Sequence, residues 1–242
     1  MKFYMLVLAL DTTTRQGSVA LTREGELLGT YSGDPAVTHG ERLPGDVNRL
    51  LAAYALHLDD VDLFAVAAGP GSFTGLRIGI ATLQGLALAN NRPLVGVSAL
   101  DALRAAVDSS QADAGPVSRS TAEVATWMDA QRGQVFSALY SGDDRREGPT
   151  VEKPADVLAR WGAEGRERRL TFAGDGALAY AALIEAAFPD AQIVAALPPL
   201  APSIARLAEM HLGRHGPAAP DAIRPLYVRR SDAELARDRA KS

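Results

Sequence analysis

Hydrophobic residues along this chain form short runs and helical stripes that follow one another in a repeating order. Residues 5–10 are a continuous apolar run that ends at Asp11, which predicts a buried strand. Other short runs predict further strands, and apolar stripes with a period near 3.6 residues predict helices. We expect strands at 5–10, 18–22, 26–31, 63–68, 93–97, 122–128, 135–140 and 170–173, and helices at 38–54, 74–90, 98–107, 154–161, 177–187 and 203–212.

Two of the predicted helices carry marked apolar faces. Thr38 and Glu41 have the spacing of a capping box, so the first helix is expected to begin there. Its apolar face consists of Leu43, Val47, Leu50, Leu51 and Tyr54. The helix near residues 74–90 contributes Leu76, Ile80 and Leu83, and we expect the two helices to pack side by side.

The order of motifs occurs twice. In the first half an apolar strand ends at Asp11 and a turn leads to a second strand; later, residues 68–71 lead into a helix. In the second half the strand ends at Asp129, and residues 173–176 again lead into a helix. This repetition predicts two similar α/β domains around a cleft. Their expected bounds are 1–108 and 121–230, with a polar linker between them and a charged tail at 231–242. The last helix of the second domain is expected to pack back on the first.

Composition narrows the function classes. The 242 residues include 29 acidic and 25 basic side chains and no cysteine, which excludes disulfides, thiolate metal sites and a cysteine nucleophile. The slight acidic excess argues against a chain that grips nucleic acid by itself. The apolar runs are shorter than the ~20 residues of a membrane span. We therefore expect a cytoplasmic protein with no targeting signal and no membrane anchor.

Two motifs have the character of nucleotide sites. Asp11, Thr12 and Thr13 end a strand in a hairpin whose amides could hold a phosphate, and Asp11 could orient a hydrated magnesium ion; alternatively the turn satisfies its own backbone. Gly174, Asp175 and Gly176 open a helix and could approach an adenosine, although an ordinary turn is the simpler interpretation.

The glycine motif at residues 69–79 lies between a strand and a helix. A helix start preceded by glycines can bind an anion, but the motif lacks the Gly-Lys-Ser/Thr ending of a P-loop. Gly75, Gly79 and Gly85 cost about 1 kcal/mol each inside or at the start of a helix. That cost favours close approach of another backbone over phosphate binding.

The histidines suggest no catalytic centre. His211 and His215 have the spacing of metal ligands on a helix, but that helix is ending there and no acidic residue completes the set. A solvated helix end is the favoured interpretation, and no metal site is expected.

Six motifs together resemble the TsaB family. They are Asp11-Thr12-Thr13, Thr38-His39-Gly40-Glu41 and residues 69–79, 93–98, 128–133 and 225–229. The resemblance spans residues 6–229. It implies the fold shared by actin, Hsp70 and sugar kinases.

The resemblance also implies a function. TsaB proteins are non-catalytic partners of TsaD, which transfers a threonylcarbamoyl group to the adenosine beside the anticodon in tRNAs reading codons that begin with adenine. TsaE, an ATPase, joins the complex, and TsaB alone forms homodimers. The resemblance therefore implies a scaffold with no cofactor of its own, with ATP and magnesium acting at the level of the complex and tRNA contacted indirectly. The eight apolar helix residues named above would form the partner and dimer interface.

Two departures from catalytic relatives support this expectation. Ala99 and Leu103 stand where the resemblance places two metal-binding histidines in TsaD, and residues 130–132 replace the glycine-rich turn of related kinases. The alternatives are an ATP-dependent small-molecule kinase or ATPase, which would use Asp11, Thr12, Gly174 and Asp175, and a metallopeptidase-like protein, against which Ala99 and Leu103 speak.

Overall fold

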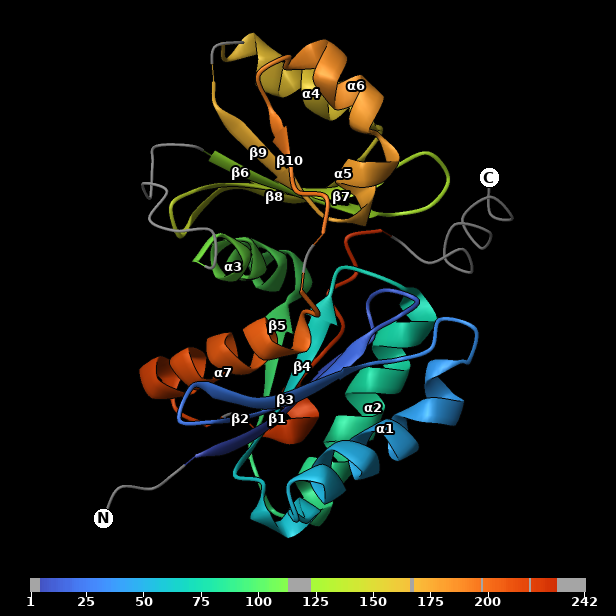
Figure 1. Ribbon diagram of the computed structural model, residues 1–242, viewed down its shortest axis with the longest axis vertical. Helices are drawn as coiled ribbons and strands as arrows, with labels where there is room; N and C mark the ends of the chain where they lie inside the picture. Colours follow the sequence, from blue (N-terminus) through green and yellow to red (C-terminus); the bar gives the residue numbers. More distant parts are fainter. Residues whose placement is uncertain (1–4, 113–122, 166–167, 197, 218, 230–242) are drawn as a thin grey trace, which may run out of the picture. The chain divides into compact units, whose positions relative to one another are not determined.

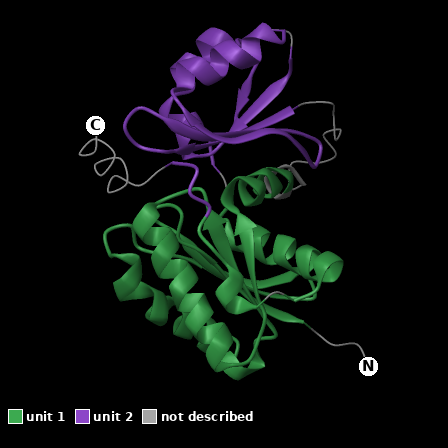
Figure 2. Ribbon diagram, turned by 180° about the vertical axis from the view of Figure 1, so that it is seen from behind, with its two compact units in different colours: residues 1–113, 197–225 green, residues 114–196, 226–242 purple. Residues whose placement is uncertain are grey.

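The computed structural model describes residues 5–112, 123–165, 168–196, 198–217 and 219–229 (Figure 1). The chain divides into two compact units (Figure 2): unit 1 contains residues 1–113 and 197–225, and unit 2 contains residues 114–196 and 226–242. The predicted second domain, 121–230, thus includes a segment that belongs to unit 1. The reason is that the helix near the C-terminus packs on the first sheet.

Unit 1 is built on a five-stranded sheet in the order β3-β2-β1-β4-β5. The strands are β1 (Leu6–Asp11), β2 (Ser18–Arg23), β3 (Glu26–Ser32), β4 (Leu63–Gly69) and β5 (Leu94–Ser98). β1 pairs antiparallel with β2, where Leu8 lies opposite Leu21, and parallel with β4, where Leu8 lies opposite Phe64. β1 is therefore central, and all six of its residues are buried.

Helices cover this sheet (Figure 1). They are α1 (His39–Ala53), α2 (Phe73–Ala89), α3 (Ala99–Ala112) and α7 (Ala201–His215), with short 3₁₀ turns η1 (Leu58–Asp60) and η2 (Pro220–Ala222). α1 begins at the predicted capping box, since the Glu41 carboxylate accepts a hydrogen bond from the Thr38 N–H at 3.1 Å. α1 packs with α2, and α3 packs with α7.

Unit 2 repeats the arrangement with a second five-stranded sheet, in the order β10-β9-β6-β7-β8. Its elements are β6 (Glu123–Asp129), β7 (Val135–Ser141), β8 (Asp144–Glu152), α4 (Pro154–Ala163), β9 (Leu170–Ala173), α5 (Asp175–Ala179), α6 (Ala181–Ala187) and β10 (Gln192–Ile193). Its core is aromatic: Trp127 meets Phe172 edge-on with ring centres 5.2 Å apart, and Trp161 lies 6.1 Å from each of them.

The two sheets share one topology. In both, the first strand is central, two antiparallel strands follow on one side, and two parallel strands lie on the other. The predicted repetition is confirmed, and the chain has the actin-like α/β fold with two similar α/β halves.

The structure differs from the predictions in three places. Residues 144–152, for which no strand was predicted, form strand β8, whose side chains are charged because the strand forms a sheet edge. The single helix expected at 177–187 is two helices that break at Tyr180, and the two-residue strand β10 was not predicted. Edge strands and two-residue strands carry too little hydrophobic periodicity to be recognised.

Candidate functional site

The turn that follows β1 is closed by hydrogen bonds to the carboxylate of its own aspartate, Asp11. Oδ1 of Asp11 accepts hydrogen bonds from the Thr13 N–H at 2.8 Å and from the Thr13 hydroxyl at 2.6 Å. Asp11, Thr12 and Thr13 are all buried. These contacts support the interpretation of a self-satisfied Asx turn rather than an open phosphate cradle.

The glycine motif packs directly on this turn. A Cβ atom added to Gly75 would lie 2.1 Å from the Thr12 carbonyl oxygen, and one on Gly79 would lie 2.2 Å from the Thr12 hydroxyl. A Cβ on Gly71 would lie 2.5 Å from that of Thr13. The absence of side chains thus lets α2 approach the hairpin, which accounts for the helix cost of Gly75 and Gly79.

A buried polar cluster joins the start of α1 to the same hairpin. Arg42 forms an ion pair with Asp46 at 2.6 Å and donates to the Gln16 carbonyl. Arg42 also lies 2.8 Å from Nδ1 of His39, whose Nε2 lies 2.9 Å from the Thr14 carbonyl oxygen. Burial, and after it the charge of Arg42, lower the pKa of His39. The family motif at residues 38–41 therefore contacts the hairpin through His39.

In unit 2 the glycine turn that leads into a helix carries Asp175, which is the first residue of α5. Oδ1 of Asp175 accepts from the Asp129 N–H at 3.0 Å and from the Gly176 N–H at 2.9 Å. Loss of water around the carboxylate raises the pKa of Asp175, and these two bonds partly oppose that effect. A Cβ on Gly176 would lie 2.9 Å from the Met128 carbonyl carbon. Gly174, Asp175 and Gly176 thus hold α5 against β6.

The turn between β6 and β7 is not glycine-rich. Gln131, Arg132 and Gly133 all adopt left-handed conformations, with φ of 60°, 59° and 72°. The Gln131 N–H and side-chain amide donate to Asp129 at 2.8 and 2.7 Å, and Arg229 donates to the Ala130 carbonyl at 2.7 Å. Two non-glycine residues in this conformation are strained, and Asp129 and Arg229 hold the turn in place.

The structure corrects the predicted interface. Seven of the eight residues are buried in the core of unit 1, each less than 7% exposed: Leu43, Val47, Leu50, Leu51, Leu76, Ile80 and Leu83. Only Tyr54 is exposed, and its hydroxyl donates to the Leu28 carbonyl. The prediction failed because an apolar stripe marks a buried face without saying what buries it, and here the chain's own sheet does so.

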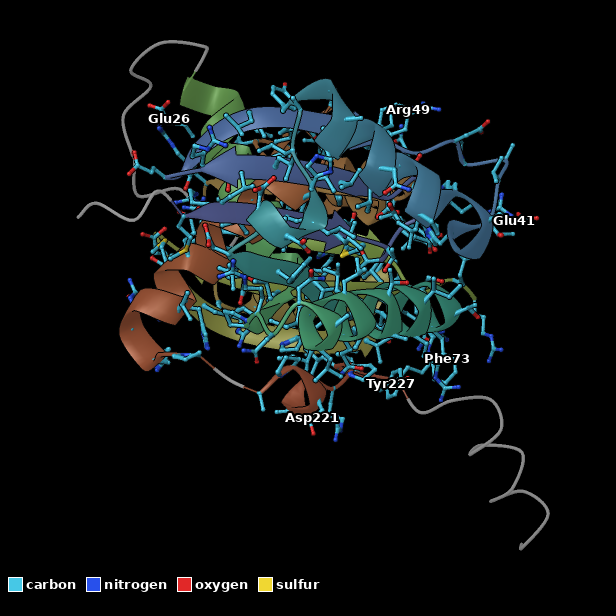
Figure 3. All side chains as sticks on the ribbon, turned by 90° about the horizontal axis from the view of Figure 1, so that it is seen from below. Glu26, Glu41, Arg49, Phe73, Asp221 and Tyr227 are labelled. Carbon is cyan, nitrogen blue, oxygen red and sulfur yellow. The ribbon has the colours of Figure 1, made fainter. Side chains whose placement is uncertain are left out.

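The opposite faces of α1 and α2 are exposed, and half of their residues are glycine or alanine. On α1 the face comprises Glu41, Gly45, Asn48 and Ala52, and on α2 it comprises Arg77, Ala81, Gly85 and Leu88. Figure 3 shows Glu41 and Arg49 of α1 extending away from the ribbon. A Cβ on Gly45 or on Gly85 would meet nothing within 4 Å. No contact within the described chain accounts for these two glycines.

The two positions at which the sequence resemblance implies metal-binding histidines in TsaD are apolar here. Ala99 and Leu103 lie one turn apart in α3 and are buried. Among the described residues no group of three or more His, Cys, Asp or Glu side chains is placed to hold a metal ion. No helix within the described ranges is long and apolar enough to cross a membrane.

Sequence reasoning did not single out Arg42 or assign a role to Arg229. Arg42 directly follows the motif at residues 38–41, and Arg229 ends the motif at residues 225–229. Arg42 contacts the hairpin of unit 1 at the Gln16 carbonyl, and Arg229 contacts the β6–β7 turn of unit 2 at the Ala130 carbonyl. An arginine within or directly after a family motif is the signal that could have identified them.

Comparison with known proteins agrees with this fold. The model of the family described as "TsaD: tRNA N6-adenosine threonylcarbamoyltransferase" matches residues 34–237. The tRNA threonylcarbamoyladenosine biosynthesis protein TsaB of Escherichia coli is 35% identical over 161 residues, covering 64% of this chain and 66% of that protein. TsaB of Bacillus subtilis is 28% identical over 95% of this chain and 96% of its own.

A solved structure extends the comparison. YeaZ from Pseudomonas aeruginosa superposes with a TM-score of 0.73 at 30% identity and covers 92% of this chain and 99% of its own. Its match includes both repeated halves, whereas the family model begins only at residue 34. The chain belongs to the TsaD-type family and, within it, to the TsaB/YeaZ group.

Proposed function

We propose that this chain is a cytoplasmic, non-catalytic subunit for threonylcarbamoyladenosine formation on tRNA, and that the exposed face of α1 and α2 binds a TsaD-type partner. A TsaE-type ATPase would join the complex, and a second copy of this chain would occupy the same face when the partner is absent. The chain would carry no cofactor, and any ATP and magnesium would act at the level of the complex. Contact with tRNA would be indirect.

The observation that carries the partner surface is that two glycines without internal packing partners lie on neighbouring helices that pack together, whereas Gly213, which also lacks such partners, stands alone near the end of α7. Gly75 and Gly79 are explained by Thr12, but Gly45 and Gly85 meet nothing within 4 Å. Each glycine costs about 1 kcal/mol relative to alanine in a helix interior. Close approach of helices from another chain would offset that cost. Leu88, which is 58% exposed, lies on the same face as Gly85 and would be covered as well.

The non-catalytic role is supported separately in each unit. In unit 1 the Asp11 carboxylate serves its own turn, and α2 packs on Thr12 and Thr13. In unit 2 the Asp129 carboxylate holds a strained turn that contains Gln131 and Arg132. Side chains at that turn would crowd a triphosphate.

The decisive experiment is copurification with the TsaD-type protein of the same organism, followed by a tRNA modification assay with and without this chain. We expect Gly85→Gln to abolish copurification and to reduce modification to the level without the chain. The variant should fold, because glutamine favours a helix more than glycine does and no atom lies within 4 Å of the new Cβ.

Gly213→Gln is the matched control. Gly213 lies at an exposed position near the end of α7, and a Cβ there would meet nothing within 4 Å. It should gain helix stability and retain both partner binding and modification. Copurification of Gly85→Gln at the original level would contradict the proposed interface, and modification that does not depend on this chain would contradict the proposed function.

A further inference from the structure

The exposed end of α7 carries two histidines one turn apart. His211 and His215 are both exposed, and their ring centres lie 4.6 Å apart with the planes tilted by 41°. Neither residue belongs to the hairpins or to the α1–α2 face. Two imidazoles at positions i and i+4 of a helix are a geometry that proteins use to bind transition metals.

The distance between the rings indicates which coordination geometry they suit. A metal–nitrogen bond is about 2.0–2.1 Å long, and the nitrogen lies about 1.1 Å from its ring centre, so a shared metal would lie about 3.2 Å from each ring centre. With one nitrogen of each ring turned toward that metal and the ring centres held in place, centres 4.6 Å apart would subtend an angle of about 90° at the metal. A tetrahedral angle would require ring centres about 5.2 Å apart.

An angle near 90° between two nitrogen ligands is typical of square-planar and tetragonal sites, which Cu²⁺ and Ni²⁺ prefer. The end of α7 adds a favourable field, because the last carbonyl groups of a helix carry partial negative charge. His215 is the last residue of the helix and His211 lies in its final turns. A cation held there would also fix this last turn.

We propose that His211 and His215 chelate a divalent late transition metal, Cu²⁺ or Ni²⁺, with water filling the remaining positions. The bond formed is the donation of one imidazole lone pair from each ring to the metal. A site with only two protein ligands remains open, so its affinity depends on both rings together. This inference is independent of the proposed function.

The test is calorimetric titration of the untagged, full-length chain with Cu²⁺ or Ni²⁺ in a non-chelating buffer. We expect one equivalent to bind, with affinity for Zn²⁺ below that for Cu²⁺. His211→Gln and His215→Gln should each weaken Cu²⁺ binding at least tenfold. The electron paramagnetic resonance spectrum of the bound Cu²⁺ should show two equivalent nitrogen ligands and should lose one of them in either variant.

Two controls separate the pair from surface histidines in general. His57→Gln removes an exposed histidine outside α7 and should leave binding unchanged. The double variant Gly213→His, His215→Gln keeps the number of histidines but places them two residues apart, on different sides of the helix, and should bind as weakly as His215→Gln. Binding unaffected by His211→Gln or His215→Gln, full binding by the relocated pair, or no binding by the parent chain would overturn the proposal.

Discussion

His39 shows at the scale of one residue how a family motif acts. Arg42 has no acceptor, so Nδ1 of His39 accepts its hydrogen bond, and Nε2 therefore carries the proton that it donates to the Thr14 carbonyl. This arrangement requires a neutral ring. Protonation would remove the acceptor and place a second positive charge beside Arg42. The hairpin contact thus depends on the charge state of one side chain.

The expected consequence is a pH-dependent contribution of His39 to stability. Unfolded histidine takes up a proton below about pH 6.5, whereas burial and Arg42 lower the pKa in the folded chain. The contribution of His39 is therefore fully present above pH 6.5 and is lost as pH falls through the lowered pKa. We expect His39→Gln to reduce the free energy of unfolding by about 1 kcal/mol at pH 8 and by less at pH 5.5.

Urea unfolding of both proteins at several pH values measures this difference, and His57→Gln serves as an exposed control. The nearby carboxylates of Asp11 and Asp46 favour the protonated ring, so they partly oppose the lowering of the His39 pKa. A difference between parent and His39→Gln that stays constant from pH 8 to pH 5.5 would contradict the assigned tautomer.

At the scale of elements, the packing of α2 on the hairpin depends on single missing methyl groups. We expect Gly79→Ala to destabilise the chain by about 1–2 kcal/mol, because overpacking outweighs the gain in helix propensity. The new Cβ would lie 2.2 Å from the hydroxyl of the fully buried Thr12. Gly85→Ala in the same helix should instead stabilise the chain by about 0.5–1 kcal/mol.

A second substitution tests the mechanism. The Thr12 hydroxyl has no hydrogen-bond partner among the described residues, so its removal leaves no partner unsatisfied. Thr12→Ala should therefore relieve most of the cost of Gly79→Ala, as measured by a double-mutant cycle of urea unfolding. Additive effects of the two substitutions would show that α2 does not meet the hairpin at these residues.

Elements differ in how far the sequence predicts them. Strands β1 and β4 and helix α2 follow from apolar runs and stripes, since those patterns directly reflect burial. The roles of Leu43 and Val47 did not follow, because periodicity identifies the buried face of a helix and not its neighbour. The glycines without internal contacts, Gly45 and Gly85, could be recognised only when the chain's own packing was known.

At the scale of the whole molecule, the repeated topology raises the question of nucleotide binding, since both halves retain the hairpin and the glycine turn of the fold. In unit 1 those elements are closed on themselves through Asp11 and Thr12. In unit 2 the same elements are held by Asp175 and Arg229. The order of motifs in the sequence predicts the duplication. That the hairpin carboxylates bind amides of their own turns follows only from the contacts within each half.

We therefore expect the isolated chain to show no micromolar affinity for ATP with magnesium and no turnover, as measured by calorimetry and by phosphate release. The assembled complex with TsaD-type and TsaE-type proteins is the positive control and should hydrolyse ATP. A micromolar dissociation constant with turnover by the lone chain, lost in Asp11→Ala, would instead favour a kinase or ATPase. The physical basis is that a phosphate-binding turn needs backbone amides that face the ligand, whereas Asp11 and Asp129 already accept such amides in their own turns.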